Sequence, residues 1–103
     1  MLGFNINRVT GMSMHPRLPD GSFILLRSVN SSALRPTCQF RVGDVVKFRH
    51  LRYGMIIKTI AAIDDEGRYW LRGEHPSSVS MNQIGPVLAE QILARVIFSL
   101  KAG

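Results

Sequence analysis

The chain has 103 residues, of which 46% are hydrophobic and 19% are charged, with a net charge of +6. This composition is globular rather than disordered, and the length allows one domain over residues 1–103 with a single compact core. No apolar run approaches the roughly 20 residues of a membrane-spanning helix. Cys38 is the only cysteine, which excludes an internal disulfide and a multi-cysteine metal site, and we expect no metal and no cofactor.

The predicted elements follow from apolar runs separated by turn residues. Residues 1–22 are dense in Gly, Pro, Ser and Asn, which is typical of loops and turns. Short apolar or β-branched runs predict strands over residues 23–27, 45–49, 55–63 and 68–72, the last two joined by a turn at 64–67. Residues 73–86 form a long polar excursion, and the ambiguous tail at 88–100 favours a strand. We expect a mainly β fold of short strands with long loops.

The basic residues are scattered singly through the chain rather than gathered in runs. Tyr53, Tyr69 and Trp70 form no repeated stacking pattern, so we expect no nucleic-acid partner. The positive charge instead predicts a general attraction to acidic partners or to anionic lipid, with at most weak association with a membrane surface.

Ser13 is a candidate nucleophile because of the residues around it, Gly11-Met12-Ser13-Met14-His15-Pro16. Gly11 permits a backbone bend that other residues resist, and Pro16 keeps His15 out of helical geometry. A serine on such a turn can have neighbouring N–H groups directed at a ligand, as acyl transfer requires. The alternative is a serine that only caps its own turn.

Lys58 is the best candidate for the base that such a serine needs, because the three histidines lie in polar turns or loops without an obviously placed Asp. In the predicted strand 55–63, Lys58 shares a face with Ile56, Ile60 and Ala62, and the opposite face is also largely apolar. Burial there removes water from the ammonium and lowers its pKa, so that a neutral amine can accept a serine proton. The alternative is a strand lysine that extends to solvent.

Four segments resemble the sequence boxes of the type I signal peptidases. Residues 11–26 (GMSMHPRLPDGSFILL) are similar to the box that bears the nucleophile, and residues 57–63 to the box that bears a general-base lysine. Residues 42–49 resemble the Gly-Asp strand between them, and residues 73–87 are a degraded form of the final box. The four segments follow the order of the family and cover nearly the whole chain.

The resemblance implies a serine endopeptidase with a Ser/Lys dyad on a mostly β fold, acting on an extended peptide segment of a protein substrate. Ser13 would attack the scissile carbonyl and Lys58 would accept its proton. The Ser13 N–H would supply part of the oxyanion hole. By its seven-residue distance to Gly85, Ser78 matches the serine that hydrogen-bonds the lysine.

Several positions match or depart from the family pattern individually. Met14 matches the methionine after the nucleophile, whereas Gly11 stands where many members carry a second hydroxyl. The resemblance therefore implies an oxyanion hole that is completed by another backbone donor or by water, or one that is less complete. The Asp and Arg of the final box fall on Ser80 and Asn82, and the Arg that usually follows the lysine is Thr59.

The sequence shows neither a secretory signal nor the membrane anchor of ordinary signal peptidases. It is therefore most similar to a small unanchored branch, the nickel-type superoxide dismutase maturation proteases, which remove a leader so that the mature amino terminus can bind nickel. The resemblance implies propeptide cleavage by a cytoplasmic protein, or by one peripheral to the membrane.

Two alternatives from other classes stay open. Self-cleaving SOS repressors share the Ser/Lys dyad, and their Val-x-Gly-x-Ser-Met resembles residues 9–14, but they cut an Ala-Gly or Cys-Gly bond well upstream of the serine. The residues before Ser13 contain no such bond. A non-catalytic relative that binds a peptide at a sheet edge would be consistent with the degraded final box. The oligomeric state stays open.

Overall fold

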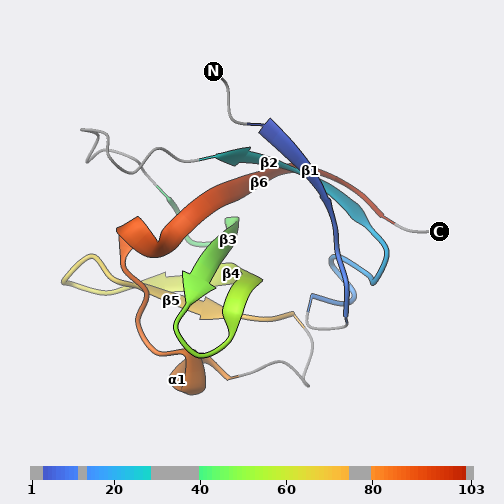
Figure 1. The fold of residues 1–103 in the computed structure, drawn as a ribbon. Coiled ribbons are helices and arrows are strands. Elements are labelled where there is room, and N and C mark those ends of the chain that lie inside the picture. The colour runs from blue at the N-terminus through green and yellow to red at the C-terminus, as the bar shows by residue number, and fades with distance from the viewer. Residues whose placement is uncertain (1–3, 12–13, 29–39, 75–79, 102–103) are drawn as a thin grey trace.

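The computed structural model describes residues 4–11, 14–28, 40–74 and 80–101, and within them it is mainly β (Figure 1). The strands form one antiparallel sheet in the order β1-β2-β6-β3-β4-β5. The strand bounds are Phe4–Arg8 (β1), Phe23–Ser28 (β2), Val45–His50 (β3), Gly54–Ile63 (β4), Tyr69–Arg72 (β5) and Ile92–Leu100 (β6). A short helix, α1, spans Met81–Ile84, and a 3-10 turn spans Ala89–Gln91. The expectation of a mainly β fold is confirmed.

The predicted strands over 23–27, 45–49, 55–63 and 68–72 lie where the sequence indicates, and the tail forms β6 from Ile92 onward. Two elements were not predicted. The first is β1, in a region expected to be loop, which pairs with β2 along its whole length. Pairing with β2, rather than burial or intrinsic propensity, fixes this strand, since none of its residues is buried.

The second unpredicted element is α1, inside the polar excursion. Ser80 begins this helix with a capping box: its Oγ accepts a hydrogen bond from Gln83 N, and its own N–H donates to Gln83 Oε1, both at 3.2 Å. A serine followed three residues later by glutamine is a start signal that the sequence does contain. Ile84 of α1 is buried against the sheet.

The carboxy-terminal strand β6 lies between β2 and β3, so it joins the β1–β2 hairpin to the β3–β4–β5 meander (Figure 1). The buried apolar residues form two separate cores. Adjacent residues of β3 belong to different cores, Val45 to one and Val46 to the other. Because successive side chains of a strand point to opposite faces, the two cores lie on opposite faces of the sheet.

The α1 core lies on the face covered by α1 and the residues after it. It contains Phe40, Val46, Phe48, Ile60, Tyr69, Leu71, Ile84, Val87 and Ile92. The turn core lies on the other face, under the connection between β1 and β2. It contains Val9, Met14, Leu18, Ile24, Leu26, Val45 and Ala94, with Ile57 and Val96 packed against it. In the described part of the chain, no helix is long and apolar enough to span a membrane.

Candidate active site

Lys58 is a buried cation near the middle of β4, with only 3% of its surface exposed. Its cross-strand partner Val46 and its strand neighbours Ile56 and Ile60 all belong to or pack on the α1 core. Because residues directly opposite each other in a sheet share a face, the Lys58 side chain leaves β4 on the face of that core. Its surroundings are therefore apolar, as the strand pattern predicts.

Burial lowers the pKa of the Lys58 ammonium from its ordinary value of 10.5. Desolvation causes this shift, since a charged amine is less favourable away from water. Among the described residues, no hydrogen bond or ion pair joins the Nζ atom to a partner that would restore the charged form. An amine in this environment is closer to a neutral proton acceptor than a surface lysine.

Ser13 belongs to the connection between β1 and β2. Two backbone hydrogen bonds close the base of this connection. Val9 N donates to Ser22 O at 2.7 Å, and Gly21 N donates to Val9 O at 2.8 Å. Gly11 adopts a φ of +91°, a left-handed value that glycine reaches without strain. This agrees with the bend expected at Gly11. Ser13 itself lies outside the described residues.

The Gly11 N–H donates to Oδ1 of Asp20 at 2.8 Å, which places a carboxylate across the base of the turn. This donor is already used inside the loop, so it does not supply the second hydrogen bond of an oxyanion hole. What the structure shows for Gly11 is its left-handed bend and this hydrogen bond.

Met14 and Leu18 attach the turn to the sheet. Both side chains pack in the turn core, and each residue has 2% of its surface exposed. Leu18 N donates to Met14 O at 2.7 Å, so the segment between them forms a tight turn. Met14 packs in the same core as Ile57, the residue before Lys58. Met14 therefore packs on the face of the sheet opposite to the Lys58 side chain.

The two faces meet at an open edge of β4. Its pairing with β5 begins only at Thr59 opposite Arg72, whereas its pairing with β3 runs from Gly54 to Thr59. No described strand pairs with Gly54–Lys58 on the side away from β3. Lys58 is the last residue of this free edge.

A carboxylate that the sequence reasoning did not single out ties the turn to this point of β4. Glu74 Oε2 accepts a hydrogen bond of 2.6 Å from Thr59 Oγ1 and lies 3.4 Å from Arg17 NH1, and Glu74 Oε1 lies 3.3 Å from Arg72 NH1. Burial of Glu74 acts to raise its pKa, but the Thr59 hydroxyl and the two guanidinium groups outweigh this and lower it. Arg17 follows Ser13 by four residues and Thr59 follows Lys58, so Glu74 joins the two candidate segments.

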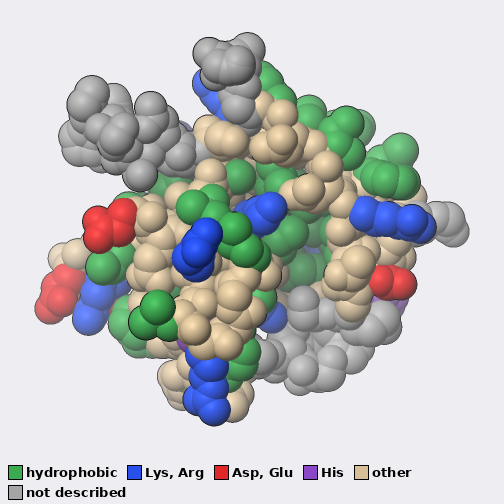
Figure 2. Space-filling model, in the orientation of Figure 1, with side chains coloured by type: hydrophobic (Ala, Val, Ile, Leu, Met, Phe, Trp, Pro, Cys, Tyr) green, Lys and Arg blue, Asp and Glu red, His purple; other side chains and the backbone are tan. Residues whose placement is uncertain are grey.

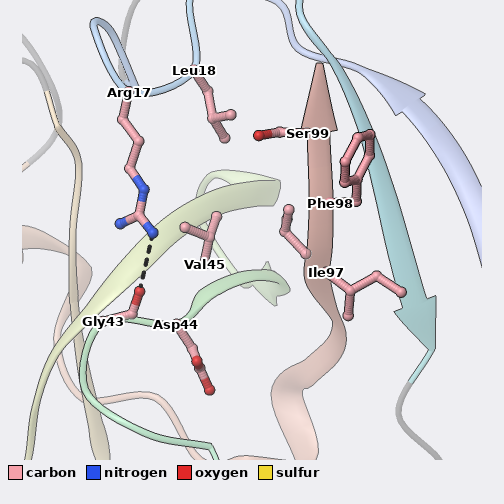
Figure 3. A pocket seen from close by; sticks show the side chains of 9 residues that line it. Arg17, Leu18, Gly43, Asp44, Val45, Ile97, Phe98 and Ser99 are labelled. Atoms are coloured by element: carbon pink, nitrogen blue, oxygen red, sulfur yellow. Dashed lines mark hydrogen bonds between the residues drawn. The ribbon is translucent and has the colours of Figure 1, made fainter. Parts of the chain in front are cut away.

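Arg17 also donates to the carbonyl of Gly43 at 3.4 Å, beside a surface pocket of about 220 Å³ (Figure 3). The pocket lies between the residues before β3 and the end of β6, and its walls include Leu18, Val45 and Phe98. Lys58 does not line it. The pocket is therefore adjacent to the turn but separate from the amine.

Among the candidate histidines, His50 has its hydrogen bonds within the fold. His50 Nε2 contacts Ile84 O at 2.9 Å, and His50 Nδ1 accepts hydrogen bonds from Arg52 N and Tyr53 N. This pattern uses both ring nitrogens of a neutral imidazole, with the proton on Nε2, in a structural role. His75, Ser78 and Cys38 lie outside the described residues, and the described part of the chain contains no cluster suited to a metal ion.

No family model matches the sequence, and no curated protein matches it significantly.

Proposed function

We propose that this chain is a serine endopeptidase in which Ser13 is the nucleophile and Lys58 the general base. The observation that carries the proposal is the burial of Lys58: only 3% of the surface of this residue is exposed, and no described residue forms an ion pair or a hydrogen bond with its amine. A desolvated amine without a carboxylate partner is costly to keep in a small core. Its presence is explained if the neutral amine is the working form.

In the proposed reaction, the Lys58 amine accepts the proton of Ser13 as Oγ forms a bond to the scissile carbonyl carbon. The tetrahedral intermediate collapses when the peptide C–N bond breaks, and Lys58 returns the proton to the leaving amine. A water then attacks the acyl ester while Lys58 takes its proton, and Ser13 recovers its hydrogen as the acid product leaves. The Ser13 N–H is the proposed oxyanion donor, with the Gly11 N–H engaged by Asp20.

The position of the turn between β1 and β2 supports a contact between Ser13 and Lys58. Glu74 holds Arg17, four residues after Ser13, next to Thr59, one residue after Lys58. This junction is also where the free edge of β4 ends, because pairing with β5 starts at Thr59. In the proposal, Ser13 approaches Lys58 at this edge, where side chains from both faces of the sheet can meet.

The free edge also supports an extended peptide as substrate. Residues Gly54–Lys58 offer one row of unpaired backbone groups among the described strands, and an added strand can bind to such an edge by main-chain hydrogen bonds. The scissile bond would then lie beside the amine at the end of this row. A non-catalytic peptide-binding protein would use the same edge, so this second candidate function stays in the test.

We propose leader or propeptide removal as the reaction, with a nickel-type superoxide dismutase precursor as the first substrate to try. The full chain is incubated with the precursor and with a pool of extended peptides that carry small side chains, and new amino termini are sequenced. We expect cleavage that Ser13→Ala and Lys58→Met abolish, whereas the matched changes Ser28→Ala and Lys101→Met keep it. Cleavage that persists in Ser13→Ala, or a stable complex without any new amino terminus, would contradict the proposal.

A further inference from the structure

One end of the sheet exposes a row of large apolar side chains on the face opposite the turn core. We call this set the apolar face; it consists of Phe4, Ile6, Phe23, Leu25, Phe98 and Leu100. Its exposed members range from 45% exposure at Phe4 to 71% at Ile6. Apolar side chains gather over this end of the molecule in Figure 2. Clustered exposed apolar residues of this kind mark an interaction surface.

The strand register shows that these side chains form one surface. Ile6, Leu25 and Phe98 are opposite one another across β1, β2 and β6, and Phe23 and Leu100 form the next row. The residues between them point the other way: Ile24 and Leu26 lie in the turn core. The face is therefore the outer side of three paired strands, and its side chains are brought together by the strand register itself.

The charged residues on the strands that form the apolar face all have one sign. The strands β1, β2 and β6 with the following residue carry Arg8, Arg27, Arg95 and Lys101, and they contain no Asp or Glu. Arg8 lies over the Phe23 ring at 5.5 Å, so a cation stands directly on the surface. Asp44 lies 3.8 Å from Arg95 and partly neutralises it. Arg8, Arg27 and Lys101 are the cations that can attract an anionic partner to this face.

We propose that the apolar face binds the surface of an anionic lipid bilayer. Apolar side chains enter the boundary between headgroups and acyl chains, and the cations at the rim meet lipid phosphates and carboxylates. A second copy of this chain fits less well, because two such faces would oppose like charges. The inference is independent of the proposed peptidase activity.

The register relates this surface to Lys58. Arg27 is opposite Arg95 in β6, Arg95 is opposite Val46 in β3, and Val46 is opposite Lys58 in β4. The apolar face and the Lys58 side chain therefore leave the same face of one sheet. If the proposed activity also holds, bilayer binding would place the free edge of β4 beside a membrane-bound substrate.

The test is cosedimentation of the full chain with phosphatidylcholine vesicles that contain or lack phosphatidylserine. We expect binding that requires phosphatidylserine and falls with added salt. Ile6→Ser combined with Phe98→Ser should weaken it by about tenfold or more. Arg8→Gln combined with Arg27→Gln should weaken it by about twentyfold, because each cation near the surface contributes roughly a factor of five.

Matched controls lie on the turn between β3 and β4. Leu51→Ser and Arg52→Gln change an exposed apolar and an exposed basic residue away from the face and should leave binding within about twofold. Lys58→Met should also bind vesicles normally, which separates this inference from the peptidase proposal. Circular dichroism verifies that each variant is folded.

Two results would overturn the inference. One is equal binding, or none, to the two vesicle types by the folded wild-type chain. The other is a dimer in lipid-free sedimentation that the Ile6→Ser, Phe98→Ser variant abolishes while vesicles are not bound, which would make the face a contact between copies.

Discussion

Thr59 Oγ1 donates a hydrogen bond of 2.6 Å to Oε2 of Glu74, and this bond joins the strand that carries Lys58 to the segment after β5. Thr59 is fully buried and Glu74 is mostly buried. If this hydrogen bond were lost, water could not easily take the place of the missing partner, so the loss would cost stability. Through Arg17 the same carboxylate reaches the turn between β1 and β2. Glu74 therefore links three segments: β4, the residues after β5, and the turn between β1 and β2.

Thr59→Val should lower the free energy of unfolding by about 1–3 kcal/mol, because it leaves a partly buried carboxylate without its best donor. Urea denaturation measures this. Glu66→Gln is the matched control, since Glu66 is exposed and meets Arg68 only at 3.5 Å. A loss at Thr59 no larger than at Glu66 would show that the bond contributes little to stability.

Lys58→Met should change how stability depends on pH. The folded-state pKa of Lys58 lies below its unfolded value, so between the two the unfolded chain binds more protons and stability rises with pH toward 10.5. Urea midpoints from neutral pH upward should show this rise in the wild type and in Lys101→Met. Lys58→Met should reduce it, and an identical rise in all three proteins would contradict the burial of a titrating amine.

Acid should remove a second contribution to stability, at the turn between β4 and β5. The Arg68 backbone N–H, with further donors from Trp70, the Arg68 side chain and the Glu66 backbone, lowers the pKa of Asp64 to about 2. A lowered carboxyl pKa stabilises the fold above the ordinary value of 3.8, and this contribution is lost as pH falls from there toward 2. Asp64→Asn should flatten the stability curve in that window, measured by thermal unfolding. Asp65→Asn, at the exposed neighbouring residue, is the control. An equal effect of this change would show that the hydrogen bonds of Asp64 are not the cause.

Gly11→Ala should destabilise the chain by about 1 kcal/mol and should reduce the proposed cleavage more than it reduces stability. Apart from its chain neighbours, no described residue has an atom within 4 Å of an added methyl group, so we expect the cost to come from backbone strain at a φ of +91°. The strain would shift the turn before Ser13 without filling any space. Unfolding and cleavage assays on one sample measure both effects, and unchanged values for both would show that the bend is not required.

The strands could be predicted because their local patterns agree with their final environments. Residues 55–63 are apolar on both sides of Lys58, and in the structure both faces of β4 meet a core. The burial of Lys58 follows from the same pattern. Met14 could be identified as a match to a family motif, but its place in the turn core depends on how the β1–β2 connection folds onto the sheet.

Long-range pairing explains what could not be predicted. β1 contains two asparagines among five residues, and it is a strand because β2 offers it an edge. Glu74 lies in a polar stretch, and its role requires Arg17, which is distant in sequence. The apolar face also required the register, because Phe98 and Ile6 become neighbours only when β6 and β1 flank β2.

The titration of the Lys58 amine tests the central claim most directly. In the full chain with lysine labelled at Cε, the chemical shift of Lys58 is followed against pH by NMR, with Lys58→Met used to assign the signal. We predict a midpoint clearly below 10.5. A Lys58 midpoint at 10.5 would mean that the amine stays charged at neutral pH, and it would contradict its role as the base for Ser13.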